Sequence, residues 1–142
     1  MSLRNPLQKM SKSDNIEASR INLTDSPDEL RKKVRKAVTD STGRITYEPE
    51  DRPGVSNLVS IYGTFAELSH DEVCTRFEGK QTVDLKEELG ELLVEKLGPI
   101  QERILKLEND PVYVDQVLRE GADKAKALAE ENLDNIRKLV GL

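Results

Sequence analysis

Two lysines and two serines lie within five residues near the start of this sequence, and their side chains can bind a phosphate chain. The segment, residues 9–13, reads Lys-Met-Ser-Lys-Ser. No apolar periodicity surrounds it, so we predict a loop. In a loop, ammonium groups can neutralise phosphate oxygens while hydroxyl and main-chain N–H groups donate hydrogen bonds. Composition alone favours a second interpretation, a solvated Lys/Ser-rich tail that binds nothing.

The order of these five residues is an intact copy of the signature loop of class I aminoacyl-tRNA synthetases. Four later segments resemble the tryptophanyl members of that class, namely residues 24–30, 36–41, 53–58 and 121–142. The resemblance extends from about Pro6 to the last residue. It favours the tryptophanyl enzymes over the tyrosyl ones, which usually add an RNA-binding domain after this region. The chain therefore resembles a C-terminal fragment of a tryptophanyl-tRNA synthetase that begins just before the signature loop.

This resemblance implies an enzyme of protein biosynthesis, a tryptophan–tRNA ligase. Its substrates are ATP, accompanied by Mg²⁺, tryptophan and tRNA(Trp), and its intermediate is tryptophanyl-adenylate. We expect no protein-bound metal. Charges that act mainly on the departing pyrophosphate lower the barrier. By residue match, the catalytic contacts are Lys9 and Lys12, and the ATP-binding set is completed by Met10, Ser11 and Ser13.

The second signature of the class, His-Ile-Gly-His or a close variant, belongs to a Rossmann-like nucleotide domain. This sequence has one histidine, His70, which we interpret as a surface residue at a helix start. No Gly-rich turn between a strand and a helix is present either. We therefore expect the nucleotide domain to be absent and this fragment to be inactive alone. The full-length enzyme is expected to be a homodimer, and the fragment a monomer.

The hydrophobic pattern predicts a mainly α fold, a helical bundle on the anticodon-binding side of a class I synthetase. We expect residues 1–20 to form a mobile loop region, with residues 1–3 as candidate vector residues, and residues 21–142 to form the α-helical anticodon-binding domain. One short strand is predicted at residues 20–23. Six helices are predicted. The first starts at Ser26 and has an apolar stripe that runs through Val38, the second starts at Val55, and the third runs from Ser69 to Gly79. The fourth starts at Thr82 and is expected to bend at Pro99, the fifth runs from Pro111 to about Gly121, and the last starts at Ala125.

Positive charge is concentrated in the first third of the chain. Residues 1–44 hold 10 Lys/Arg and 6 Asp/Glu, a net charge of +4. Residues 45–142 hold 12 Lys/Arg and 21 Asp/Glu, a net charge of −9, so the whole chain carries −5. A polyanion should therefore bind the first third. The basic run on the first predicted helix is a candidate contact for tRNA phosphates, and the alternative is a solvated face balanced by Asp28 and Glu29. Its members are Arg31, Lys32, Lys33, Arg35 and Lys36.

Several other interpretations remain open. The chain can instead be a tyrosyl-type synthetase fragment, a non-catalytic helical RNA-binding module, or an interaction protein with a disordered tail. Tyr47 and Tyr113 can stack on RNA bases, whereas Tyr62 falls on an apolar stripe and is predicted to be core. Cys74 is the single cysteine, expected half-buried on a helix, and fits a reducing compartment. No apolar run is long enough to cross a membrane. We therefore expect bacterial cytoplasm, with the mitochondrial matrix as the alternative.

Overall fold

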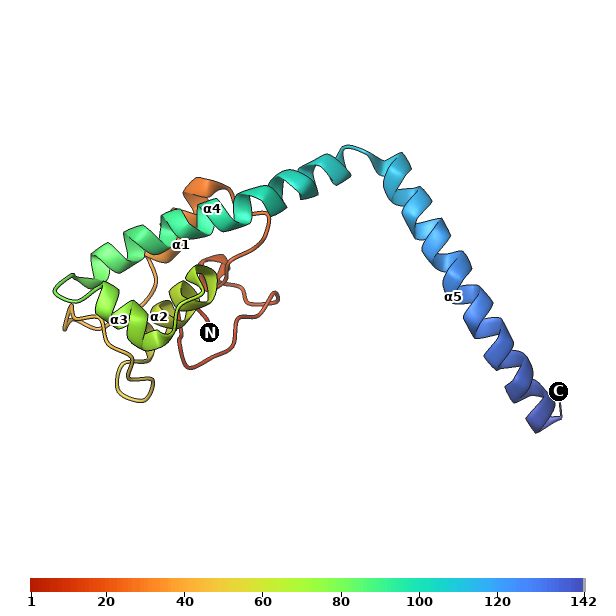
Figure 1. Cartoon of the computed structure of the whole chain (residues 1–142), viewed down its shortest axis with the longest axis horizontal. Coiled ribbons are helices and arrows are strands. Elements are labelled where there is room, and N and C mark those ends of the chain that lie inside the picture. Colours follow the sequence, from red (N-terminus) through yellow and green to blue (C-terminus); the bar gives the residue numbers. More distant parts are fainter. Residues whose placement is uncertain (142) are drawn as a thin grey trace. The chain divides into compact units, whose positions relative to one another are not determined.

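Helices make up the regular structure of this chain. The computed structural model describes residues 1–141, apart from the side chain of Glu131, and no strand occurs among them. The mainly α prediction is confirmed. A short 3-10 helix and five α-helices follow one another along the chain (Figure 1), with the bounds η1 Glu17–Ser19, α1 Pro27–Arg35, α2 Pro53–Ala66, α3 His70–Arg76, α4 Thr82–Glu108 and α5 Pro111–Val140.

The chain divides into two compact units, Met1–Gln101 and Glu102–Leu142. This division lies within α4, and the predicted separation of residues 1–20 from residues 21–142 stays a prediction. Residues 1–20 belong to the first unit because their main chain is hydrogen-bonded to it and Leu3 is only 2% exposed. Leu3, one of the three candidate vector residues, thus forms part of the core.

Two helices begin where the sequence predicts, at capping boxes. In α1 the Ser26 hydroxyl accepts the Glu29 N–H at 3.4 Å, and the Glu29 carboxylate accepts the Ser26 N–H at 2.8 Å. Ser69 and Glu72 form the same reciprocal pair at the start of α3, at 3.3 and 2.8 Å. Each box satisfies main-chain N–H groups that the first helical turn leaves without a partner.

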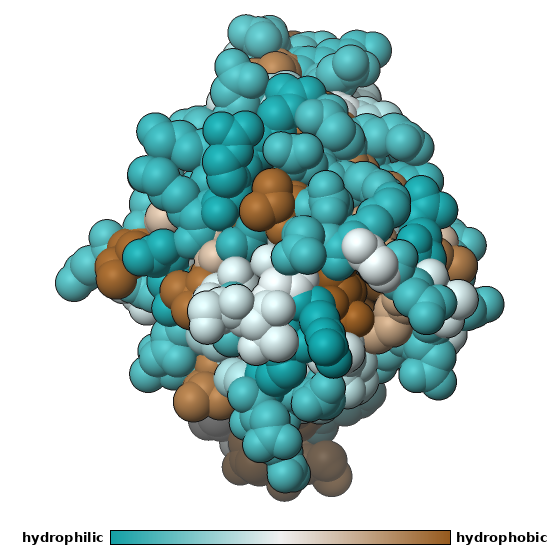
Figure 2. All heavy atoms as spheres, turned by 90° about the vertical axis from the view of Figure 1, so that its left-hand side faces the viewer, coloured by the Kyte–Doolittle hydropathy of each residue, from teal (hydrophilic) through white to brown (hydrophobic). Residues whose placement is uncertain are grey.

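One hydrophobic core lies within the first unit. Leu30 and Val34 of α1 are completely buried, as their spacing predicts. Helix α4 contributes a leucine at every fourth residue, because positions i and i+4 share one face of a helix. These are Leu85, Leu89, Leu93 and Leu97. The end of this unit that faces the viewer in Figure 2 is mostly hydrophilic, with separate hydrophobic spots.

Two expectations near the start of the chain are wrong. Residues 20–23 do not form a strand, because the Asn22 N–H donates to the Asp25 carboxylate at 2.8 Å and closes a turn. Helix α1 ends at Arg35 and does not continue through Val38, whose side chain is 41% exposed. The chain leaves the helix there, and the Val38 N–H donates to the carbonyl of Leu3 at 2.8 Å.

Two glycines do not end helices as predicted. Helix α3 ends at Arg76, and Gly79, which does have the predicted positive φ of 77°, lies outside it. Gly121 lies inside α5, so the two predicted C-terminal helices are one helix of 30 residues. A single interior glycine costs about 1 kcal/mol, which a helix of this length tolerates. The terminating glycine is Gly141, with φ of 81°.

Helix α5 presents large hydrophobic side chains to solvent, each between 43% and 86% exposed. They are Val112, Tyr113, Val117, Leu118, Leu128, Leu133, Ile136, Leu139 and Val140. None of the described helices combines the length and apolar character needed to cross a bilayer. Pro99 lies inside α4, and the bend that we expect there stays a prediction.

Candidate functional site

The predicted phosphate loop, residues 9–13, is a loop in the structure, and its polar side chains point outward. Lys9, Ser11, Lys12 and Ser13 are exposed, whereas Met10 is half-buried and packs against the core. Among residues 1–141, neither lysine forms an ion pair. The methionine thus anchors the loop while both ammonium groups stay available for a ligand.

The hydroxyl groups of Ser11 and Ser13 lie 3.0 Å apart, within hydrogen-bonding distance. A hydroxyl can donate one hydrogen bond and accept two, so the pair can turn toward a phosphate oxygen when one arrives. The loop therefore offers two positive charges and two neutral donors within five residues. This arrangement can bind a polyphosphate and cannot by itself supply a nucleophile or a proton acceptor.

Both ends of the loop are fixed by main-chain hydrogen bonds from consecutive residues. The Ser2 N–H donates to the carbonyl of Gln8, and the Leu3 N–H donates to the carbonyl of Ser19, each at 2.8 Å. The loop that contains the two lysines is therefore closed at its base. Ser2 and Leu3 were not predicted as part of this site, because no local pattern indicates that they bond to residues six and sixteen positions away.

Asp14, directly after the loop, fixes the chain where it leaves the site. Its carboxylate accepts the Ile16 N–H at 2.8 Å, and its carbonyl accepts a hydrogen bond from the Arg20 guanidinium at 2.9 Å. The Ile16 amide and the Ser19 hydroxyl lower the pKa of Asp14 below its ordinary value. Asp14 is thus an anionic turn residue whose charge lies next to the two lysines in sequence.

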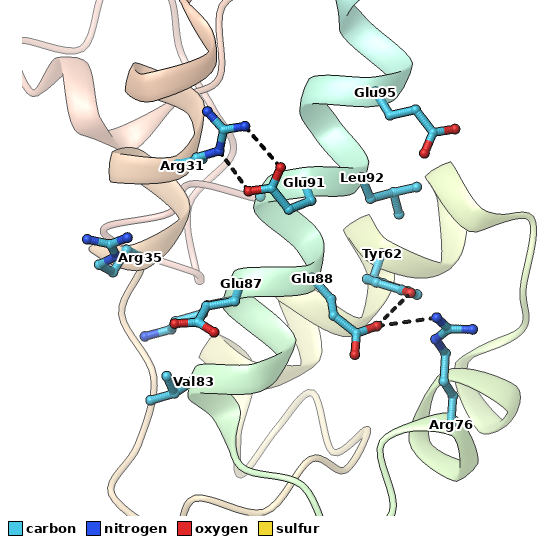
Figure 3. A pocket seen from close by; sticks show the side chains of 12 residues that line it. Arg31, Arg35, Tyr62, Arg76, Val83, Glu87, Glu88, Glu91, Leu92 and Glu95 are labelled. Atoms are coloured by element: carbon cyan, nitrogen blue, oxygen red, sulfur yellow. Dashed lines mark hydrogen bonds and ion pairs between the residues drawn. The ribbon is translucent and has the colours of Figure 1, made fainter.

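Arg31, the first residue of the predicted RNA-binding run, is engaged within the protein. Its guanidinium binds both carboxylate oxygens of Glu91 on α4, at 2.7 and 2.9 Å (Figure 3). It also approaches the Asp28 carboxylate at 3.2 Å. The Glu91 carboxylate raises the pKa of Arg31, and the guanidinium lowers the pKa of Glu91. These groups line a groove of about 650 Å³ with a second ion pair, Arg76–Glu88. Because the groove carries both signs of charge, it is not a phosphate site.

Lys33 does not lie on the surface, contrary to its place in the predicted RNA-binding run. Its ammonium group is 2.7 Å from both carboxylate oxygens of Asp25, and its side chain is 9% exposed. A lysine is buried in this way only when a carboxylate compensates for its lost hydration. Lys33 is therefore a structural residue.

Lys32 and Arg35 remain exposed on α1, and Lys36 is exposed at its C-terminal cap. Arg4 lies beside them, because its guanidinium donates to the carbonyl of Lys36 at 2.6 Å. A cation at the C-terminal end of a helix is favourable, since the last carbonyl groups carry partial negative charge. The candidate RNA contact is thus reduced to three exposed side chains of the original five, with Arg4 at its edge.

The remaining candidate residues have structural partners. His70 is half-buried and stacks on Tyr47, with the ring centroids 3.7 Å apart, so it is not a simple surface residue. Tyr62 is core, as predicted, and meets Phe77 edge to face at 5.1 Å. Cys74 is half-buried on α3, as predicted, and burial raises the pKa of its thiol. None of these residues contributes to the loop.

Comparison with known proteins identifies relatives of one kind. The sequence model of a family described as tRNA synthetases class I (W and Y) matches residues 1–98. The chain is 43% identical over 142 residues to the tryptophan–tRNA ligase of Caldanaerobacter subterraneus subsp. tengcongensis, covering 100% of this chain and 43% of the relative. It is 45% identical over 144 residues to the enzyme of the same name from Mesorhizobium japonicum, covering 41% of that relative.

A solved structure has a similar fold. The crystal structure of tryptophanyl-tRNA synthetase from Mycoplasma pneumoniae matches with a TM-score of 0.83 and 29% sequence identity, over 100% of this chain and 43% of that chain. This chain therefore spans less than half the length of the relatives that it matches. The match to the family model begins at residue 1, so it includes the residues that close the loop.

Proposed function

Since this chain belongs to the class I tRNA synthetases for tryptophan and tyrosine, we propose that it is part of a tryptophan–tRNA ligase. In that enzyme a carboxylate oxygen of tryptophan bonds to the α-phosphorus of ATP, and the bond from that phosphorus to pyrophosphate breaks. The aminoacyl group then passes from the adenylate to the 3′ end of tRNA(Trp), and AMP leaves. The proposed role of this chain in the first step is to hold the triphosphate.

One observation carries the proposal: the ammonium groups of Lys9 and Lys12 are exposed on a loop that is fixed at both ends. Negative charge grows on the pyrophosphate as its bond to the α-phosphorus breaks. Fixed positive charges at that place stabilise the transition state more than the bound substrates and so raise kcat. Ser11 and Ser13 supply further hydrogen bonds, and Met10 holds the loop against the core. Mg²⁺ would arrive with ATP and offset part of the phosphate charge.

Tryptophan is the proposed amino acid because relatives named tryptophan–tRNA ligase align with the whole chain. A tyrosyl-type enzyme is the alternative within the same family. The amino-acid pocket is expected in the part of the relatives that this chain does not span.

We propose that these 142 residues do not activate tryptophan alone. The class signature that contains two histidines is absent from them, and His70 stacks on Tyr47 at the start of α3. We also propose that the full-length enzyme is a homodimer in the cytosol of a bacterium, with the mitochondrial matrix as the alternative compartment.

The exposed cations of α1 support a second role, contact with tRNA phosphates. Lys32 and Arg35 lie on α1, and Lys36 caps its C-terminal end. The other two cations of the run, Arg31 and Lys33, are held in ion pairs. A non-catalytic RNA-binding module would use the same side chains without the loop. The two functions differ in their dependence on ATP.

The test is a chimera in which this chain replaces the matching segment of the Caldanaerobacter ligase. We expect it to catalyse tryptophan-dependent ATP–pyrophosphate exchange. Lys12→Ala should lower kcat by about 100- to 1000-fold, the usual effect of removing one preorganised electrostatic group. Lys124→Ala, which removes an exposed lysine of α5, is the control. A folded chimera whose activity is unchanged by Lys9→Ala and Lys12→Ala together would refute the phosphate role, and exchange that depends on tyrosine would favour the alternative amino acid.

A further inference from the structure

The loop is closed by residues Met1–Leu3, which we call the brace and of which Ser2 and Leu3 are buried. Ser2 binds the carbonyl that precedes Lys9, and Leu3 binds the carbonyl of Ser19 beyond the loop. Because these two bonds come from consecutive residues, a shift of the brace would move both ends of the loop together. The position of the two lysines therefore depends on what holds the brace.

Asn57 of α2 holds the brace through hydrogen bonds to its main chain. The side-chain nitrogen of Asn57 donates to the carbonyls of Met1 and Ser2 at 3.2 and 3.3 Å, and its side-chain oxygen accepts from the nitrogen of Met1 at 3.0 Å. A carboxamide carries the same donor and acceptor groups as a peptide unit. The Asn57 side chain thus forms hydrogen bonds to the main chain of the brace like those that a peptide unit of a neighbouring strand would form.

The surroundings of Asn57 make these bonds hard to replace. Asn57 is 8% exposed, and Ser2 and Leu3 are 3% and 2% exposed. Water has little access, so the loss of the amide would leave the brace carbonyls without partners, which is costly in a buried site. The brace is also held by the Leu3 carbonyl, which accepts the Val38 N–H at 2.8 Å, and by the buried Leu3 side chain.

We propose that Asn57 is a positioning residue for the phosphate loop: through the brace, it fixes where Lys9 and Lys12 meet the triphosphate. This inference rests on the proposed function. Asn57 does not touch the loop and needs no contact with ATP. Its effect is geometric, and a displacement of about 1 Å at a reacting group can lower a rate by about 100-fold.

Ser56, the neighbouring residue on α2, provides a matched control. It is 3% exposed, and its hydroxyl accepts the Glu48 N–H at 2.9 Å. Ser56 therefore stabilises the connection before α2 and has no bond to the brace. A variant at Ser56 should lower the melting temperature without moving the loop, which separates positioning from general stability.

The first measurement is amide hydrogen exchange on this chain, which needs neither ATP nor activity. In Asn57→Ala, the amides of Leu3 and Val38 should exchange at least about ten-fold faster than in the wild type. Ser56→Ala should leave both rates close to the wild-type values. If Asn57→Ala proves unfolded by circular dichroism, Asn57→Asp replaces it, since this isosteric side chain keeps the acceptor for Met1 and loses both donors. Unchanged rates in the folded Asn57 variant would overturn the proposal.

The second measurement is ATP–pyrophosphate exchange in the chimera. The Asn57 variant should lower kcat between about ten- and 100-fold while the KM for tryptophan stays unchanged, because the tryptophan site lies elsewhere. An equal loss in Ser56→Ala, or a rise in KM alone, would overturn the inference. If Lys9→Ala and Lys12→Ala together have no effect, the proposed function fails. If Lys12→Ala lowers kcat and the folded Asn57 variant does not, only the role of Asn57 fails.

Discussion

The ammonium group of Lys33 lies 2.7 Å from both carboxylate oxygens of Asp25, and the two side chains are only 9% and 5% exposed. Helix α1 is thereby fixed to the turn that precedes it. Asp25 also accepts two hydrogen bonds from Asn22, so its carboxylate is well compensated despite burial. A residue that looks like one cation in a basic run is in fact a structural element of the core.

Removal of Lys33 should therefore cost more stability than removal of its neighbours. Lys33→Met leaves the Asp25 carboxylate buried without its cation, and we expect a loss of about 3–5 kcal/mol in the free energy of unfolding of the first unit. Lys32→Met, at an exposed position, should change it by less than about 0.5 kcal/mol. Urea unfolding checks both values, and the double variant Asp25→Asn/Lys33→Met should recover part of the loss. Equal effects at the two lysines would contradict the buried pair.

The pair Asp40–Arg52 predicts a dependence of stability on pH. The Arg52 guanidinium binds both oxygens of Asp40, at 2.9 and 3.0 Å, and lowers the pKa of this carboxyl group from 3.8 to about 2. A lowered folded-state pKa contributes stability above the unfolded-state value, and that contribution is lost as the pH falls from 3.8 to about 2.

Asp40→Asn should remove this part of the acid sensitivity. At neutral pH we expect the melting temperature of this variant to be lower than that of the wild type. The difference between the two melting temperatures should become smaller as the pH falls from about 4 to about 2, which is the interval between the unfolded-state and folded-state pKa values of Asp40. Thermal unfolding followed by circular dichroism across that range measures it. Asp51→Asn, at an exposed position nearby, serves as the control. A difference that stays constant with pH would exclude the ion pair as its cause.

Gly54 should not tolerate a side chain, although it lies in a helix. A Cβ atom there would lie 2.4 Å from the Val38 carbonyl oxygen and 3.2 Å from the Thr39 Cα, so the backbone must move. We expect Gly54→Ala to destabilise the first unit by about 1–3 kcal/mol. Gly121→Ala has no atom within 4 Å of its new Cβ and should stabilise α5 by about 0.5–1 kcal/mol. Denaturant unfolding measures the change in the free energy of unfolding for each variant. Changes of the same sign in Gly54→Ala and Gly121→Ala would contradict this prediction.

The exposed cations of α1 predict a salt-dependent affinity for tRNA. Each phosphate contact that is removed should make the slope of log K against log salt concentration about 0.9 less steep. Arg35→Ala and Lys36→Ala should each show this change, and Lys124→Ala on α5 should not. Fluorescence titration at several salt concentrations measures the slopes. If the α1 variants leave the slope unchanged, the helix does not contact RNA.

Local chemistry made much of this fold predictable. The capping boxes at Ser26 and Ser69 depend on residues three positions apart, so sequence alone determines where α1 and α3 start. The stripe through Leu30 and Val34 likewise follows from the period of a helix. The outward position of residues 9–13 follows from the absence of any such period around them.

Long-range contacts could not be predicted in this way. Nothing near Lys33 in sequence distinguishes it from Lys32, because the pairing with Asp25 depends on how the turn before α1 folds back. The bonds from Ser2 and Leu3 to the two ends of the loop, and those between Asn57 and residues Met1 and Ser2, join residues up to 56 positions apart. Such contacts form only after the helices have packed, so no pattern within a short window indicates them.

Pro99 has a consequence for how the chain melts. It has no N–H, so the carbonyl of Glu95 lacks its partner within α4, and Gly98 beside it adds backbone freedom. The two compact units divide two residues further along, at Gln101 and Glu102. Since the helix is weakest at that seam, and α5 draws no stability from a buried face, we expect helical signal to disappear in two separate steps on heating.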